Sequence, residues 1–167
     1  MGKTIKALVS MFLLVATILC VAGCGQQALS EPEKSAARFI DCLYSGDGQG
    51  FVDLMSDDLV EQLMETYDYK TEELLVYAYN KELADEIEDR KWDFGNNWKY
   101  EISVIDSYQV EIPKEYNGYE VIEVCLKVEH TGRKLLLFKV DETEEFEIQM
   151  IKIDTTWYVL AWEKTVI

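Results

Sequence analysis

The sequence has a single histidine, His130, in 167 residues, and half as many basic residues (16) as acidic ones (32). One histidine and the well-separated Cys42 and Cys125 cannot supply the clustered ligands of a zinc site. The formal net charge of −16 argues against a nucleic acid partner, because binding depends on cations that neutralise phosphates. A Gly-x-Ser-x-Gly nucleophile motif is also missing. The sequence therefore indicates no cofactor and no catalytic metal.

What the chain does contain favours a folded domain. Hydrophobic residues make up 49% of the sequence and aromatic residues 12%, which is too much apolar surface for a disordered chain. There is no internal repeat and no low-complexity segment. The length fits one domain that buries a real core.

The N-terminus has the pattern of an export signal. Lys3 and Lys6 precede an apolar run at 7–21 that is broken only by Ser10 and Thr17. Charged residues followed by an apolar run of this length are typical of a secretory signal. A spanning helix needs about 20 residues, so the run is short for a transmembrane helix. An uncleaved membrane anchor is the alternative interpretation.

The run ends in Val21-Ala22-Gly23-Cys24, which resembles the bacterial lipobox. The resemblance implies that a diacylglycerol is attached to the thiol of Cys24 and that the signal is cut between Gly23 and Cys24. We therefore expect a lipoprotein signal peptide at 1–23, a short tether at 24–29 and a single domain at 30–167. Either interpretation of the N-terminus places that domain on the extracytoplasmic side of the cell membrane. Under the first, a lipid on Cys24 would hold it there; under the second, the uncleaved segment would.

The tether limits how far the domain can lie from the membrane. Six residues reach at most about 21 Å when fully extended. Loss of Lys3 and Lys6 with the signal would change the net charge from −16 to −18. An acidic surface is not attracted to anionic lipid, so we expect a membrane-proximal domain with a solvated acidic surface.

Three stretches before position 95 have apolar residues every three or four positions, which predicts amphipathic helices. The first follows Ser30-Glu31-Pro32-Glu33, a capping box with proline in the tolerated first turn. The second spans about 51–66, with a restart at Ser56, and the third begins near Thr71.

From Trp98 the apolar period changes to two, the pattern of half-buried strands. We expect strands at 98–112, 122–128, 135–140, 146–153 and 157–162, with turns at Asn117-Gly118 and Thr131-Gly132. Helices followed by an antiparallel meander predict an α+β fold, with N-terminal helices on one face of a curved antiparallel sheet.

Strand parity predicts on which face of the sheet Cys125 and the remaining apolar side chains lie. Cys125 alternates with Val124 and Leu126, so it should point away from the helices and out of reach of Cys42. Apolar residues that could share its face are Tyr119, Val121, Leu135, Leu137, Ile151 and Ile153. Either they form an apolar patch for a homodimer or an envelope partner, or local bulges bury some of them.

The order of elements and the closing segment 152–160 resemble the nuclear-transport-factor-2-like cone, a cystatin-related α+β fold. The resemblance implies a pocket between helices and sheet, where enzymes with this fold place an Asp or His base. It also implies pairing through the sheets, which many members show.

Two residues are candidates for such a base. His130 stands beside the expected Thr131-Gly132 turn, so a surface turn is favoured over a catalytic role. Asp106 interrupts the apolar stripe of the first strand, where a buried carboxylate could act as a base. A bulge that exposes the acid is the favoured interpretation.

Two further clusters each allow a functional and a structural interpretation. The acidic run at 141–145 lacks the spacing of a calcium loop, which favours a solvated turn. The aromatic residues Trp92, Phe94, Trp98 and Tyr100 could line a ligand pocket, but sealing the junction between helix and sheet is favoured.

Together these features predict a membrane-anchored, non-enzymatic binding or interaction module. The alternative is a small-molecule receptor or an enzyme that uses the cone-shaped pocket with Asp106 and the nearby aromatic residues.

Overall fold

Helices make up the first half of the part of the chain that the structure describes. The computed structural model describes residues 28–111, 114–134 and 138–167. The helices are α2 (Glu31–Ser45), α3 (Gly48–Asp53), α4 (Asp57–Tyr67) and α5 (Glu72–Phe94). Cys24 and the rest of the expected signal and tether up to position 27 lie outside the described residues.

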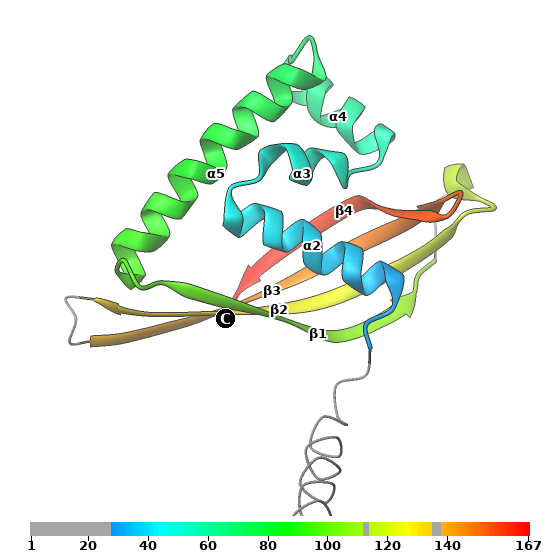
Figure 1. The fold of residues 1–167 in the computed structure, drawn as a ribbon. Helices are drawn as coiled ribbons and strands as arrows, with labels where there is room; N and C mark the ends of the chain where they lie inside the picture. Colours follow the sequence, from blue (N-terminus) through cyan, green and yellow to red (C-terminus); the bar gives the residue numbers. More distant parts are fainter. Residues whose placement is uncertain (1–27, 112–113, 135–137) are drawn as a thin grey trace, which may run out of the picture.

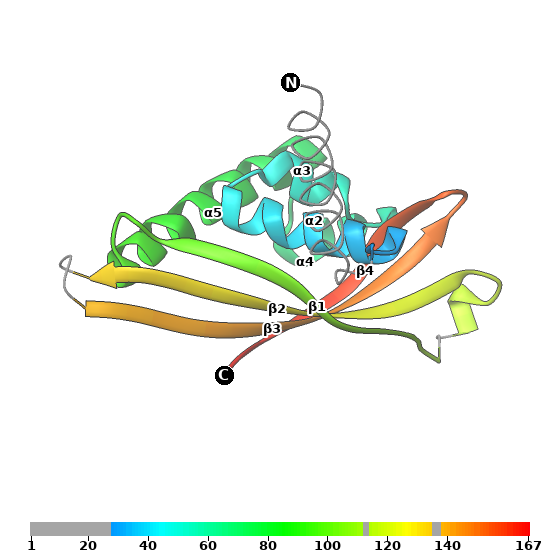
Figure 2. The ribbon, with the colours of Figure 1, turned by 60° about the horizontal axis from the view of Figure 1, so that its bottom comes forward.

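The second half is one antiparallel sheet. Its strands are β1 (Lys99–Gln109), β2 (Glu120–Lys134), β3 (Phe138–Ile153) and β4 (Thr156–Val166), with the short 3-10 helix η1 (Lys114–Tyr116) before β2. The strands lie side by side in chain order, β1-β2-β3-β4. The α-helices all lie on one face of this sheet (Figure 1, Figure 2). The predicted α+β fold is confirmed.

Local signals explain where the helices begin and end. The backbone N–H of Ser30 donates to the Glu33 carboxylate at 2.7 Å, as expected at a capping box. Ser56 accepts a hydrogen bond from the backbone of Leu59 and starts α4, which confirms the predicted restart. Gly46 ends α2 in the left-handed conformation, with φ of +80°.

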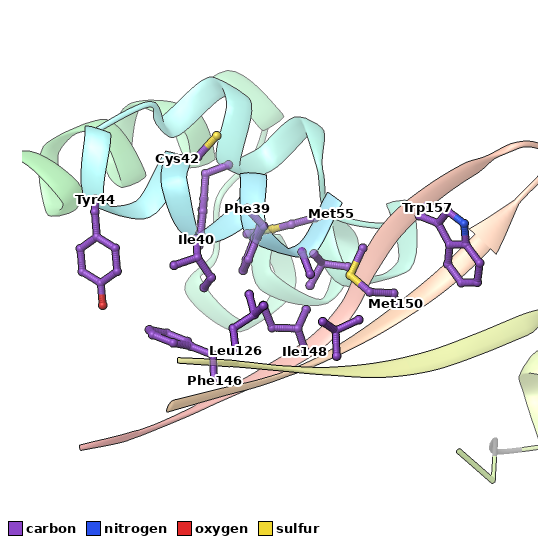
Figure 3. Close-up of a cluster of buried hydrophobic side chains, with 14 of the residues drawn as sticks. Phe39, Ile40, Cys42, Tyr44, Met55, Leu126, Phe146, Ile148, Met150 and Trp157 are labelled. Atoms are coloured by element: carbon purple, nitrogen blue, oxygen red, sulfur yellow. The ribbon is translucent and has the colours of Figure 1, made fainter. Parts of the chain in front are cut away.

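The core lies between α2, α3 and the inner face of the sheet (Figure 3). Phe39 and Ile40 of α2 are fully buried, as are Leu126, Ile148 and Met150 on the central strands. The inward residues of β2 and β3 alternate along each strand, which confirms the parity that the sequence predicted. Cys42 lies in this core, Cys125 lies on the other face, and both are free thiols.

A bulge changes the parity of β1. Its register with β2 shifts between Val104 and Asp106. Beyond the shift, Tyr108 is opposite Glu123 and its side chain is exposed. The apolar stripe that the period of two predicts for the strand at 98–112 therefore does not continue inward at Tyr108, because one extra residue moves the following side chains to the other face.

The outer face of the sheet carries mostly charged side chains along its middle. Neighbouring positions there include Glu101, Glu123, Cys125, Lys127, Glu129, Glu145, Glu147 and Glu163. The outward pair Val121 and Ile151 is buried. Leu135 and Leu137 lie outside the described residues, so both alternatives for this face, an apolar patch for a homodimer or an envelope partner and burial through local bulges, stay predictions.

The predicted turn at Thr131-Gly132 was wrong. Strand β2 continues through both residues to Lys134, where it pairs with Phe138 of β3. Gly132 serves another purpose: a Cβ atom there would lie 2.1 Å from the carbonyl oxygen of Phe94. The glycine allows the end of α5 to approach the strand.

Replacing Gly132 by alanine is expected to lower the free energy of unfolding by about 2–3 kcal/mol, because overpacking forces the end of α5 away from the strand. Urea denaturation would measure the loss. Thr131→Ala changes an exposed neighbour and should cost under about 1 kcal/mol. Equal effects of the two substitutions would contradict the close-approach argument.

Candidate functional site

A cavity of about 350 Å³ opens between the helices and the inner face of the sheet. Helices α3, α4 and α5 line one side, and strands β3 and β4 line the other. Six of its lining side chains are aromatic: Phe51, Tyr67, Tyr69, Tyr79, Phe146 and Trp162. Its volume falls in the range typical of small-molecule sites.

The aromatic rings of this cavity hold one another in place. Phe51 stacks on the core residue Phe39 with ring centroids 4.2 Å apart. The same ring meets Tyr79 edge-on at 5.1 Å and Trp162 at 5.8 Å. Edge-to-face pairs of this kind add to area burial. The inner wall of the cavity is therefore continuous with the core.

Next to the cavity lies a buried carboxylate, Glu144 of β3. Its side chain is fully buried and takes four hydrogen-bond or charge partners. Oε2 meets the Tyr44 hydroxyl and His130 Nε2, the latter at 2.9 Å. Oε1 accepts from Arg90 Nη2 at 2.6 Å and lies 3.3 Å from Lys164 Nζ. Both carboxylate oxygens are saturated.

These partners keep Glu144 ionised. Burial by itself would raise the pKa of the carboxyl, but hydrogen bonds from His130 and Tyr44 and the charges of Arg90 and Lys164 outweigh it. The net result is a pKa well below the usual range. Burial and the neighbouring carboxylate raise the pKa of the Tyr44 hydroxyl, which stays protonated and donates.

The protonation pattern of His130 follows from its neighbours. The indole N–H of Trp98 can only donate, and it donates to Nδ1 of His130 at 3.2 Å. Nδ1 is therefore an acceptor, so Nε2 carries the proton that the ring donates to Glu144. Both ring nitrogens of His130 are occupied inside the fold.

Arg90 connects helix α5 to this network. Besides Glu144, its guanidinium contacts Glu86 at 2.9 Å and Glu142 at 2.6 Å. Burial opposes the charge of Arg90, but its bonds to the carboxylates outweigh this and raise its pKa. The side chain of Arg90 thus links the C-terminal end of α5 to β3.

The network and the cavity share one residue. Lys164 of β4 lines the cavity and also forms the 3.3 Å ion pair with Glu144. The other charged side chain of the lining is Glu82 of α5. The site therefore combines an aromatic cavity with a polar end that is fixed by buried charges.

The structure corrects two predictions at this site. His130 is fully buried in β2 instead of lying on a surface turn, because the strand continues past it. The run at 141–145 is not a solvated turn: it lies in the middle of β3, where Glu142 and Glu144 face Arg90.

Asp106 lies away from the cavity. It is exposed at the bulge of β1, as the favoured interpretation predicted. Of the four clustered aromatic residues, Phe94, Trp98 and Tyr100 pack near His130 and Tyr44 at the junction of helix and sheet. Trp92 is 78% exposed and does not join them.

Sequence reasoning missed the Tyr44, Arg90 and Glu144 network, although one signal was present. Glu144 has the same parity as Phe146, Ile148 and Met150, so extending the predicted strand at 146–153 by two residues at its start would have placed it inward. Within the described ranges, no group of three or more His, Cys, Asp or Glu side chains could hold a metal ion.

Comparisons with known proteins find likenesses in structure only. One is a ketosteroid isomerase-like protein from Erwinia carotovora atroseptica, with a TM-score of 0.45 and 12% identity over 86% of this chain and 98% of that one. Another is the intermembrane space region of the chloroplast protein ARC6, with a TM-score of 0.29 and 10% identity over 84% and 98%. No family model and no curated protein matches the chain.

Proposed function

We propose that the protein is a lipid-anchored, extracytoplasmic binding module that takes a small, largely apolar ligand in the aromatic cavity. The observation that carries the proposal is the 350 Å³ cavity with six aromatic side chains in its lining. Apolar cavities with a few fixed polar groups are the usual form of a small-molecule site. Membership of the nuclear-transport-factor-2-like family is part of the proposal.

The state of the buried polar groups favours binding over catalysis. A general base needs a free lone pair within reach of the proton that it takes. Both oxygens of Glu144 and both nitrogens of His130 are already engaged. Asp106 lies outside the cavity lining. We therefore assign the network to holding the cavity wall in shape.

A neutral apolar dye tests the binding function. N-phenyl-1-naphthylamine should bind the purified protein saturably and gain fluorescence as it enters the cavity. Ala78 lines the cavity, so Ala78→Phe should fill it and weaken binding by about tenfold or more, because overpacking leaves no room for the ring. Dye titration monitored by fluorescence measures both affinities.

The matched control is Ala84→Phe, which adds the same ring to an exposed position on the same helix. It should leave dye affinity unchanged. If Ala78→Phe binds the dye as well as the unmodified protein, the cavity is not the binding site and the proposal fails.

The proposed anchor rests on the segment that ends in Cys24. No helix within 28–111, 114–134 or 138–167 is long and apolar enough to cross a membrane. Burial of acyl chains contributes about 0.8 kcal/mol per CH₂, so two or three chains on Cys24 would hold the domain stably. A ligand site within a short tether of the bilayer suits a ligand that partitions into or passes through it.

Replacing Cys24 by alanine is expected to leave the precursor uncut and without lipid, because the thiol that receives the diacylglycerol is removed. Electrophoretic mobility and labelling with a fatty acid measure both effects. Cys20→Ala, which removes the other thiol of the same segment, should be processed normally. Normal processing and labelling of the Cys24→Ala variant would contradict the anchor.

A further inference from the structure

Two opposite charges line the aromatic cavity, and they do not pair with each other. Lys164 is committed to Glu144, with its Nζ 3.3 Å from Oε1. Glu82 of α5 has no ion-pair partner among the residues that the structure describes. The cavity therefore presents one carboxylate whose charge is not balanced by the protein.

Aromatic rings gather around that carboxylate. Tyr79 lies one helical turn before Glu82 on α5, and both line the cavity with Tyr67 and Tyr69. The rings of Tyr67 and Tyr69 are 6.2 Å apart. Burial raises the pKa of Tyr79 to about 12, and the charge of Glu82 adds to the rise. The three tyrosines and the carboxylate of Glu82 therefore line the same part of the cavity.

Faces of aromatic rings attract cations, by about 0.5–1 kcal/mol at exposed sites and by more where water is excluded. Glu82 and Tyr67 are exposed, so this end of the cavity lies at its mouth and the smaller value applies. A carboxylate among such rings adds a full negative charge to their quadrupoles. The same features repel an anion. The chemistry of this end of the cavity is therefore that of a site for a positively charged organic group.

We propose that the cavity takes an organic cation, with an ammonium group held between Glu82 and the faces of Tyr67, Tyr69 and Tyr79. The apolar body of the ligand would lie deeper, against Phe146 and Trp162. This inference rests on the proposed binding function and adds the chemical class of the ligand. It commits the site to an amine or quaternary ammonium on an apolar or aromatic body.

The surrounding charges favour a cation over an anion. The three carboxylates of Glu86, Glu142 and Glu144 outnumber the two cations of the network beside the cavity, Arg90 and Lys164. An anion at Lys164 would compete with Glu144, which already holds that ammonium. The net charge of −16 also raises the local concentration of cations around the protein.

Three probes of nearly equal size separate the possibilities: 2-phenylethylamine, which is a cation at pH 7, neutral 2-phenylethanol and anionic 3-phenylpropanoate. Calorimetric titration of the full-length protein should show the amine binding about tenfold tighter than the alcohol. The anion should bind more weakly than the alcohol. Raising the salt concentration should reduce the preference for the amine.

Three variants test whether Glu82 causes the preference for the amine. Glu82→Gln should weaken binding of the amine towards the affinity of the alcohol, with only the attraction of the ring faces left, and it should leave the affinity for the alcohol unchanged. Glu88→Gln, on an exposed position of the same helix, removes the same charge and should change neither. Lys164→Met should not weaken the amine.

Each other outcome overturns the inference. Equal affinities for the three probes would leave the ligand-binding function in place and remove the charge preference. Tightest binding of 3-phenylpropanoate, lost in Lys164→Met, would show that the site takes an anion. No binding of any probe, together with no dye binding, would remove the proposed function itself.

Discussion

Replacing Glu144 by glutamine is expected to lower the free energy of unfolding by about 3–5 kcal/mol at pH 7, the usual cost of removing one partner from a buried ion pair. Glutamine has nearly the same shape, so the loss reports on charge. Its amide would place donor hydrogens against Arg90 or against His130 and Tyr44, which are themselves donors. Urea denaturation measures the difference.

The effect of this substitution should depend on pH. The pKa of Glu144 is lowered in the folded protein, so the folded state binds its proton less readily than the unfolded chain. The stabilisation is fully present above the ordinary glutamate pKa of about 4.3 and is lost as the pH falls below it. The difference in free energy of unfolding between the unmodified protein and the Glu144→Gln variant should therefore narrow by up to about 1.4 kcal/mol per pH unit in acid.

Glu147→Gln is the matched control, because it removes the same charge from an exposed position on the outer face of the same strand. Its effect should stay within about 0.5 kcal/mol and should not narrow in acid in the same way. A Glu144→Gln protein as stable as the Glu147→Gln protein at pH 7 would show that the network does not stabilise the fold.

Replacing Phe39 by alanine should cost about 3–5 kcal/mol, because the substitution leaves a cavity at the centre of the core. Phe39 is fully buried and touches both layers. Its ring stacks on Phe51 at 4.2 Å and meets Trp162 edge-on at 5.3 Å. Since both neighbours line the ligand cavity, the affinity for N-phenyl-1-naphthylamine should fall as well.

Two comparisons test this explanation. Phe39→Leu refills part of the space and should cost less than the alanine change, roughly 1–2 kcal/mol. Tyr77→Ala removes an aromatic ring that is 70% exposed on α5 and should change stability by no more than about 0.5 kcal/mol. If Phe39→Ala costs no more than Tyr77→Ala, the central position of Phe39 in the core is wrong.

The network of buried charges helps to keep the cavity open. A cavity forfeits packing contacts, and this one lies between helices α3, α4 and α5 and strands β3 and β4. Arg90 joins α5 to β3 through Glu142 and Glu144, and Lys164 connects Glu144 to the cavity wall. Buried charge pairs with several fixed partners resist displacement, so they can hold α5 at a set distance from the sheet beside an unfilled space.

The sequence alone determined the fold class and most of the faces. The capping box at Ser30, the restart at Ser56 and the start of the last helix near Thr71 are local signals, and local hydrogen bonding decides them. Alternation along the strands placed Leu126 and Ile148 in the core and Cys125 on the other face. The helix starts depend on hydrogen bonds between near neighbours in the chain. The faces of the strands follow from the period of two residues in a strand, so neither feature needs a contact with a distant residue.

Only the tertiary structure decided which polar residues are buried. Thr131-Gly132 has the composition of a turn, but Gly132 stays in the strand because Phe94 comes within reach of its backbone. Glu144 looks like part of a solvated acidic run, and it is buried because Tyr44, Arg90, His130 and Lys164 arrive from four other elements. Such a carboxylate is stable only when its partners are present, and their arrival depends on contacts across the whole chain.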